Sequence, residues 1–538
     1  MNSVTRSDGL SVLQSAVCVL GLIVFGFVFV RVAVAPERGL ATPSTLGAVG
    51  GALILAAVLY FGRLRSRRIF RAVACWNAKR KRVALFVAHG GMTVVACVVA
   101  LAAYKPFRGG WDVDIVTNAA VAWAKGALTS DPPLPGSTDS GYFGTYPNNI
   151  PLLDFLHLVA LVVGPGAFPI VTLLMGPVLA SVTVALVFNI ARRHGTMLQA
   201  LVAWAATWLL VGVNPWIAVP YTDTLTLIFP VLLVYILERA FGSPSLRGRL
   251  GWLACFGLAT GVGAQLKMTV IVVSIAAALV ICVASLARRG TRAALGVCAV
   301  VLVASTVVAT EASAVVSKAV LPSGMIQSQP WPTQYWVLTG LSEPYGQWNS
   351  SVVALMNATT SDAVRRQTAD AAIDSRLQEL GVGGYVNFVY KKITWVYSDA
   401  TFYALGEGQM SPVAPFAYGN LVARVIQEFI SPGSGVMNTI YSTALQSIWL
   451  VVLGYGLVTM FRRLRAPFDW YVCLLTVSLL GVTAYQIVGE ARARYVLIFV
   501  PLFVLLACFG SSRSTRQIAE HQAAEKRQAR TPESNILL

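Results

Sequence analysis

RLRSRRIFRAVACWNAKRKR, residues 63–82, lies between two long apolar stretches and decides how the chain folds. It carries nine Lys or Arg residues and no acidic residue. The flanking stretches, 45–62 and 83–104, are about long enough to cross a membrane, since a spanning helix needs about 20 mostly apolar residues. A basic loop between two such segments is typical of the cytoplasmic side. We therefore predict an integral membrane protein with 63–82 inside.

The composition supports a chain with many spans. Of its 538 residues, 56% are hydrophobic and 12% are charged, against about 25% charged in an ordinary soluble domain. The first apolar run, 11–34, is longer than the core of a cleavable signal peptide, so we interpret it as a span. Seven of the eight cysteines fall in apolar runs and Cys75 falls in the basic loop, which predicts no disulfide framework.

Hydropathy predicts an all-α polytopic protein with about twelve transmembrane helices and both termini inside. A thirteenth apolar run, 150–164, is short and contains Asp154 and His157. Four more basic clusters fall on the inner side, with 63–82, only if this run does not cross. We predict that it is an interfacial or re-entrant helix. The predicted spans are 11–34, 45–62, 83–104, 167–190, 197–213, 221–238, 250–266, 268–287, 293–313, 441–461, 469–488 and 494–510.

This topology predicts two large external segments, the first acidic and the second long enough to fold as a soluble domain. Within the second, 361–381 has helical spacing and ends in Gly381, a typical helix stop. The predicted organisation is N-terminal spans at 1–104, an external catalytic loop with interfacial helices at 105–165, core spans at 166–313, an external domain at 314–440, C-terminal spans at 441–510 and a polar cytoplasmic tail at 511–538.

Several kinds of chemistry find no support in the sequence. It contains no GxxxxGK[ST] phosphate loop and no HExxH zinc motif, and its four histidines suggest no Ser-His-Asp set. The net charge of +18 is concentrated in loops between apolar runs, which indicates the positive-inside pattern rather than nucleic-acid binding. We expect membrane lipids as partners, with some arginines contacting anionic headgroups.

Polar residues gather instead at the predicted outer ends of spans. Two of these patches place cations outside, against the positive-inside rule, which indicates that they bind an anion such as a phosphate. The residues are Asp112 and Asp114 after span three; Tyr146, Asn148 and Asn149 in YFGTYPNNIPLLDF; Tyr221 and Asp223 in VPYTDTLTL; Lys267 in QLKMT; and Glu490, Arg492, Arg494 and Tyr495 in GEARARYVLIFVPLF.

The order of these motifs resembles the C-type (GT-C) membrane glycosyltransferases, within the broad protein-mannosyltransferase and aminoarabinose-transferase-like group. The resemblance rests on a first acidic external loop, a YPNN-x-PLL helix, a lysine at an outer turn, a long late external loop and a terminal EARxRY. It covers about 105–165 and 219–270 well, and 395–510 loosely. It implies a polyprenyl-phosphate sugar donor, used on the outer face of the cytoplasmic membrane. The richness in Ala, Val, Gly and Arg suggests a bacterium with a GC-rich genome, for which we expect a cell-envelope glycan, lipid or protein as acceptor.

The resemblance also implies residue roles. An acidic residue of the first external loop acts as general base, and Asp112 fits best by its spacing to Gly126, with Asp114 in reserve. The sequence has Asp-Val-Asp where the family commonly has Asp-Glu, so the choice stays open. Lys267, Arg492 and Arg494 are candidates for the donor phosphate. Because these cations can hold a monophosphate leaving group, we expect no obligatory metal or other cofactor; a metal held by Asp112 and Asp114 is the alternative. The candidate substrate-binding residues are Tyr146, Asn148, Asn149, Tyr221, Asp223, Glu490 and Tyr495.

Other readings compete with this one. A secondary transporter or lipid-linked-sugar flippase also suits twelve spans, although we find no internal repeat and no ionisable residue at mid-span. A polysaccharide ligase or polymerase also has a large late external loop. Individual residues have structural readings too, because Asp112 suits the N-terminus of a helix over 113–125 and Lys267 suits contact with headgroups.

Overall fold

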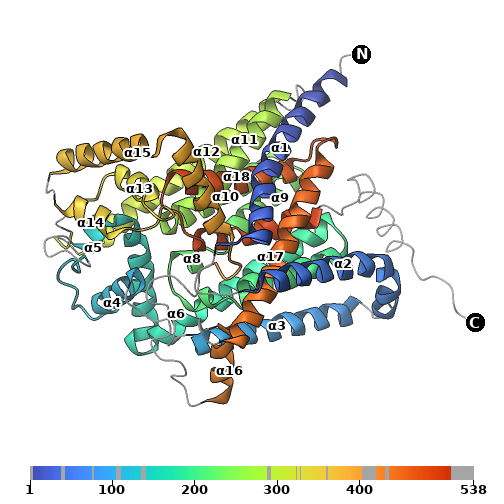
Figure 1. Ribbon diagram of the computed structural model, residues 1–538, viewed down its shortest axis with the longest axis horizontal. Helices are drawn as coiled ribbons and strands as arrows, with labels where there is room; N and C mark the ends of the chain where they lie inside the picture. The colour runs from blue at the N-terminus through green and yellow to red at the C-terminus, as the bar shows by residue number, and fades with distance from the viewer. Residues whose placement is uncertain are drawn as a thin grey trace, which may run out of the picture.

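The protein is a helical bundle whose computed structural model is shown in Figure 1. The structure describes residues 4–37, 43–74, 78–103, 111–134, 141–287, 292–322, 324–326, 329–358, 361–402, 420–430 and 435–509. Over these residues it has no β-strand, and the β-type pairing there is an isolated bridge between Pro133 and Gly141. The predicted polar tail, 511–538, lies outside the described residues, as do 104–110 of the first external loop and 403–419 of the second.

The helices follow the apolar runs of the sequence. Their bounds are α1 Val4–Val34, α2 Thr45–Ala74, α3 Ala78–Ala103, α4 Asp112–Ala124, α5 Tyr142–Thr145, η1 Pro147–Asn149, α6 Ile150–His194, α7 Met197–Thr207, η2 Trp208–Gly212, η3 Pro215–Ala218, α8 Thr222–Leu225, α9 Phe229–Gly242, α10 Leu246–Leu266, η4 Met268–Val270, α11 Ile271–Ala287, α12 Arg292–Val320, α13 Thr333–Gly340, α14 Ser350–Asn357, α15 Asp362–Tyr397, α16 Leu421–Ile430, α17 Val436–Arg463, α18 Trp470–Val488, α19 Arg494–Leu497 and α20 Val500–Phe509.

The membrane class predicted from hydropathy is confirmed. Within the described residues, nine helical stretches are long and apolar enough to cross a membrane. Two shorter apolar helices, at 197–212 and 500–509, and the 21-residue α10 occupy the other predicted spans. Large apolar side chains point outward along the bundle, for example Ile23, Phe86 and Val300, as expected of a surface covered by lipid. The count of twelve crossings and their direction stay predictions.

Helix α6 consists of two helices that meet at Gly164, close to the boundary that the sequence analysis placed between 150–164 and 167–190. It runs for 45 residues with a break at Gly164, whose φ of 77° is in the left-handed region that glycine adopts without steric cost. A straight helix of that length would measure roughly 68 Å, more than twice the hydrocarbon thickness of a membrane. The break therefore lets 150–163 lie against α4 at a different angle from the span that follows.

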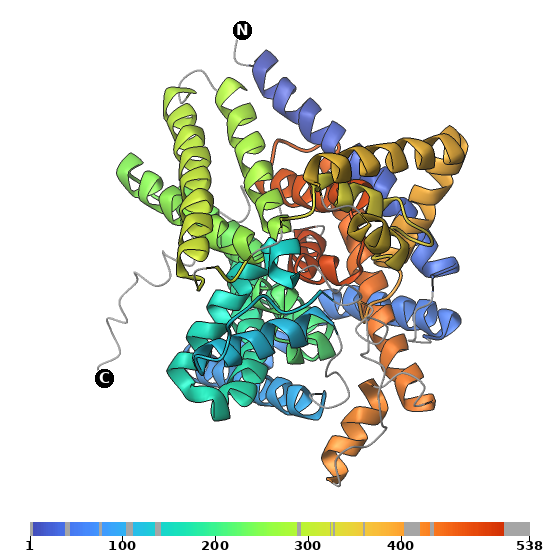
Figure 2. The same cartoon turned by 90° about the vertical axis from the view of Figure 1, so that its left-hand side faces the viewer.

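Part of the segment 314–440, which was predicted to be external, is packed into the bundle. Helix α15 is broken at Gly381, with φ of 57°, at the predicted helix end, but then continues to Tyr397. The part after the break packs on α1 and α18, and Trp395, Tyr397 and Phe402 belong to the same apolar core as the spans. In Figure 1 the short helices α4, α5, α13 and α14 gather at one end of the bundle. Figure 2 views that end directly and shows the red C-terminal helices between the cyan and gold segments.

Candidate functional site

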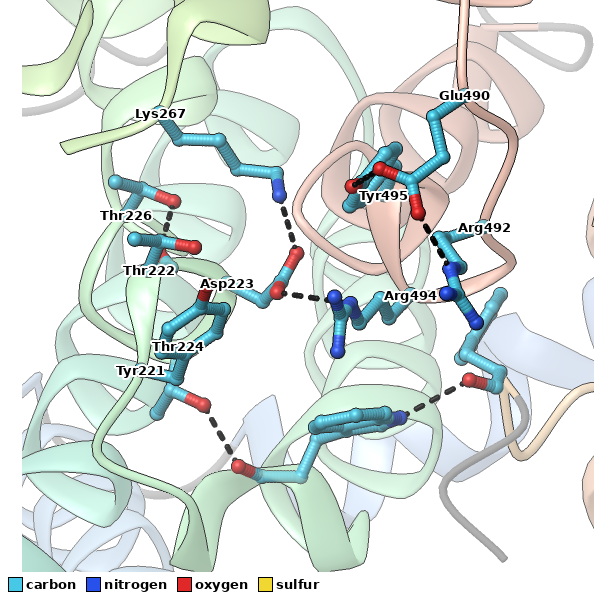
Figure 3. Close-up of polar contacts among 12 residues, drawn as sticks. Tyr221, Thr222, Asp223, Thr224, Thr226, Lys267, Glu490, Arg492, Arg494 and Tyr495 are labelled. Carbon is cyan, nitrogen blue, oxygen red and sulfur yellow. Dashed lines mark hydrogen bonds and ion pairs between the residues drawn. The ribbon is translucent and has the colours of Figure 1, made fainter. Parts of the chain in front are cut away.

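The site is built around a buried ion cluster formed by Asp223, Lys267 and Arg494 (Figure 3). The carboxylate of Asp223, in the single turn of α8, is 0% exposed. The Lys267 Nζ lies 2.6 Å from Asp223 Oδ1, and the Arg494 Nε lies 3.5 Å from Oδ2. The two cationic side chains are 9% and 7% exposed. Turns at the ends of helices supply all three, since Lys267 lies between α10 and η4 and Arg494 begins α19.

Aromatic rings enclose the two cations. The Lys267 Nζ is 3.8 Å from the centroid of the Tyr495 ring. The Arg494 guanidinium carbon is 4.6 Å from the Trp111 ring, 5.6 Å from the Tyr221 ring and 5.7 Å from the Trp216 ring. Such contacts stabilise a desolvated cation by about 1–2 kcal/mol each.

The inner cluster places two cations on one carboxylate. Burying a charge is costly unless it is paired. Burial lowers the pKa of Lys267, while Asp223 opposes that effect. Glu490 acts in the same direction as Asp223, so two carboxylates favour the charged form of this lysine.

A second ion pair lies beside the first. The Arg492 Nε is 3.0 Å from Glu490 Oε1, and the Tyr495 hydroxyl donates to Glu490 Oε2 at 3.2 Å. The Arg492 side chain also donates to Gln347 Oε1 at 3.4 Å. Figure 3 shows Glu490, Arg492 and Arg494 coming from one segment, with the Arg494 side chain reaching toward Asp223. The terminal EARxRY motif therefore contributes to both ion pairs.

Asp112 is joined to the cations through Tyr221. Asp112 begins α4 and is half-buried. The Tyr221 hydroxyl donates to Asp112 Oδ2 at 3.0 Å, and its oxygen lies 3.3 Å from Asn149 Oδ1. The same Tyr221 ring contacts the Arg494 guanidinium, as does Trp111, the residue before Asp112. An acid from the first external loop and cations from 267 and 494 thus lie in one site.

Asp114 lies on a different side of α4. Two helical residues are about 200° apart around the axis, so its side chain diverges from that of Asp112. It is half-buried, and the contacts described above that link Asp112 to the cations do not include it. The geometry favours Asp112 as the acid of the cluster. Among the described residues, no group of three or more His, Cys, Asp or Glu side chains could hold a metal ion.

The YPNN turn divides its residues between two environments. Asn149 is buried and donates to the Tyr142 hydroxyl at 2.6 Å. Tyr146 is buried under the second external segment, with its hydroxyl 3.1 Å from that of Tyr335; burial raises the pKa of Tyr335 to about 12. Asn148, placed among the substrate-binding residues by the sequence, is exposed and takes no part in the contacts of the ion cluster. Neighbouring residues of the tight turn η1 point in different directions, which a motif alone does not reveal.

The sequence analysis missed the two tryptophans of the site. Trp111 and Trp216 contact the Arg494 guanidinium, and their rings meet edge to face with centroids 6.2 Å apart. The Trp216 Nε1 donates to the Phe402 carbonyl at 3.0 Å. The position of Trp111 directly before Asp112 was an available signal, because an aromatic residue beside a candidate acid often packs in the same site.

The comparisons with known proteins concern the whole chain. No curated protein matches it. A family model described as "Conserved hypothetical integral membrane protein" matches residues 16–515. The chain therefore belongs to this family of conserved integral membrane proteins.

Proposed function

We propose that the protein is a membrane glycosyltransferase that moves a sugar from a polyprenyl-phosphate donor to a cell-envelope acceptor on the outer face of the bacterial cytoplasmic membrane. One observation carries the proposal. Asp112 is 3.0 Å from a tyrosine hydroxyl whose ring packs on Arg494, so an accessible acid lies next to buried cations. Transfer from a lipid phosphate requires that combination.

The proposed chemistry assigns one role to each side of the site. Asp112 takes the proton of the acceptor hydroxyl as that oxygen bonds to the anomeric carbon of the sugar. The bond from that carbon to the phosphate oxygen breaks, and the polyprenyl phosphate leaves with the electron pair. Lys267 and Arg494 stabilise the negative charge that develops on the leaving oxygen. A preorganised site can stabilise such charge strongly. The donor carries its own activation, so the step needs no nucleotide.

Before the donor binds, Asp223 is the ion-pair partner of both cations. Its carboxylate is held by both Lys267 and Arg494, so a phosphate either joins Asp223 or displaces it from one of them. Either arrangement brings the phosphate to two cations that can donate charge-assisted hydrogen bonds to it. Arg492, 15% exposed and paired with Glu490, is the more accessible cation and suits first contact with the phosphate.

The positions of the basic residues support an outward-facing site. Asn149 of the site lies at the start of α6, while Arg193 lies at its other end, paired with Glu238 at 3.3 Å. Glu490 follows the end of α18, while Asp469, paired with Arg463 at 3.2 Å, precedes its start. Under the positive-inside rule the ends with 193 and 463 are cytoplasmic, which puts the ion cluster outside. This orientation agrees with the proposed topology of twelve spans with both termini inside.

The proposal is tested with purified protein in liposomes. Polyprenyl-phosphate sugars with labelled mannose or arabinose are offered together with envelope lipid and glycan acceptors. We expect the label to leave the donor and appear on an acceptor. A donor that crosses the bilayer intact would instead establish a flippase, and label that stays on the donor with every acceptor would contradict the proposal.

A further inference from the structure

A second buried lysine lies near the site without belonging to its ion pairs. Lys392, on the second half of α15, is 0% exposed. Its Nζ donates to three backbone carbonyls, those of Gly340 at 2.6 Å, Gly489 at 2.7 Å and Ile487 at 3.1 Å. A lysine side chain donates through each N–H that it carries, three as an ammonium and two as an amine, so it can bridge these carbonyls in either protonation state. The next residue toward the N-terminus, Lys391, is exposed, so burial is specific to one lysine of the pair.

The three carbonyls belong to the ends of two helices. Gly340 is the last residue of α13, Ile487 lies in the last turn of α18, and Gly489 is its C-cap residue. The last carbonyls of a helix have no partner within the helix, and the partial negative charge there favours a cation. Lys392 therefore caps two helix C-termini that come from segments almost 150 residues apart.

The segment that follows Gly489 carries Glu490, Arg492 and Arg494. The Ala491 N–H donates to the Gly346 carbonyl at 2.8 Å. A Cβ added at Gly346 would lie 2.7 Å from the Lys392 Nζ, and a Cβ added at Gly340 would lie 2.6 Å from the Gly489 carbonyl carbon. Packing is therefore tight between the turn at 340–346, Lys392 and the start of the 489–494 segment.

We propose that Lys392 is a positioning residue, which holds the 489–494 segment against α13 so that Arg494 reaches Asp223 and the Glu490–Arg492 pair lies beside that contact. The placement of the segment stands on the contacts above. Only the description of those residues as a transfer site rests on the proposed function.

Burial of Lys392 predicts that opening of the 489–494 segment depends on pH, which can be measured. Burial lowers the pKa of Lys392 to about 7, against the opposing effect of Glu490. Of the other charged groups on the elements packed against it, Arg492 is paired with Glu490 and Glu343 is paired with Arg376. A group whose pKa is lower in the closed state gains a proton when the segment opens, so opening becomes harder as the pH rises from about 7 toward 10.

Hydrogen–deuterium exchange of the full chain in nanodiscs tests the proposal without any measurement of sugar transfer. Exchange in 487–496, corrected for the intrinsic pH dependence of the amides, is compared in the wild type, Lys392→Met and the matched control Lys391→Met. We expect at least tenfold faster opening of 487–496 in Lys392→Met and no change in Lys391→Met. Opening in the wild type should slow between pH 7 and 10, and the profile of Lys392→Met should be flat.

A purely space-filling role would leave both the rate and the pH profile of Lys392→Met equal to those of the wild type, and that result overturns the proposal. Should Lys392→Met fail to fold, Lys392→Gln keeps two N–H donors and should show opening between the wild type and full loss. Should neither fold, the wild-type profile decides, and a flat profile between pH 7 and 10 overturns the proposal. A transfer assay that fails while this exchange result holds would remove the proposed function and leave Lys392 in its positioning role.

Discussion

Replacing Asp223 by asparagine tests the ion cluster most sharply, because the change removes one charge and almost no volume. In the wild type the carboxylate is fully buried, with Lys267 at 2.6 Å and Arg494 at 3.5 Å. The aromatic rings around the two cations remain in the variant, so the loss is that of the carboxylate alone. Removing one partner of a buried pair costs about 3–5 kcal/mol, and here two cations lose the same partner.

We expect the free energy of unfolding of Asp223→Asn, measured by denaturant titration in mixed micelles, to fall by about 3 kcal/mol or more. Asp362→Asn is the matched control, because Asp362 pairs with Arg366 on an exposed face of α15, where such a pair is worth about 0.5 kcal/mol. Adding Lys267→Met to Asp223→Asn should recover part of the loss, since it removes one of the two uncompensated charges.

The Asp223→Asn variant also tests whether the site binds a phosphate. If Lys267 and Arg494 bind a phosphate, loss of the competing carboxylate should make polyprenyl phosphate stabilise Asp223→Asn more than it stabilises the wild type. The reasoning would be refuted by an Asp223→Asn protein as stable as Asp362→Asn, because the carboxylate would then not be the buried partner of two cations.

Three further outcomes are expected. Tyr221→Phe removes the hydroxyl that donates to Asp112; a hydrogen bond to a charged group is worth about 1.5–3 kcal/mol, so we expect transfer to slow by about 10- to 100-fold with donor affinity unchanged, and equal rates would place the acid elsewhere. Arg492→Ala should raise the apparent KM for the donor more than that for the acceptor in steady-state assays, and an effect confined to the acceptor would argue against a phosphate role. A reporter fused after Arg193 should read as cytoplasmic in whole cells; an external reading would make 150–164 a true span.

Much of the fold follows from hydropathy because a membrane imposes length and polarity on every crossing helix. The helix end at Gly381 was likewise predictable, since glycine adopts the positive φ found there without steric cost. The boundary at Gly164 was predictable as well, because a glycine followed by a proline indicates a helix end, and the backbone at Gly164 is non-helical. The packing of α15 into the bundle depends on contacts with α1 and α18 that no local pattern carries.

The site was predictable as a set of residues but not as a set of contacts. The charge rule singled out Lys267 and Arg494 as cations on the wrong side, and Asp223 stood among the candidates, yet nothing in the spacing showed that the three form one cluster. Nothing in the sequence indicated that Lys392 is buried. It lies beside an exposed lysine in YKKITW, and only the distant ends of α13 and α18 decide that one of the two is buried.

In the proposed mechanism Asp112, and not Asp114, supplies the carboxylate that acts as general base beside the lipid phosphate. This assignment is tested most directly by single-turnover transfer from a labelled polyprenyl-phosphate sugar in proteoliposomes, with Asp112→Asn and Asp114→Asn compared at saturating donor. We expect Asp112→Asn to bind the donor with unchanged affinity and to transfer no sugar, while Asp114→Asn turns over. Full transfer by Asp112→Asn would contradict it.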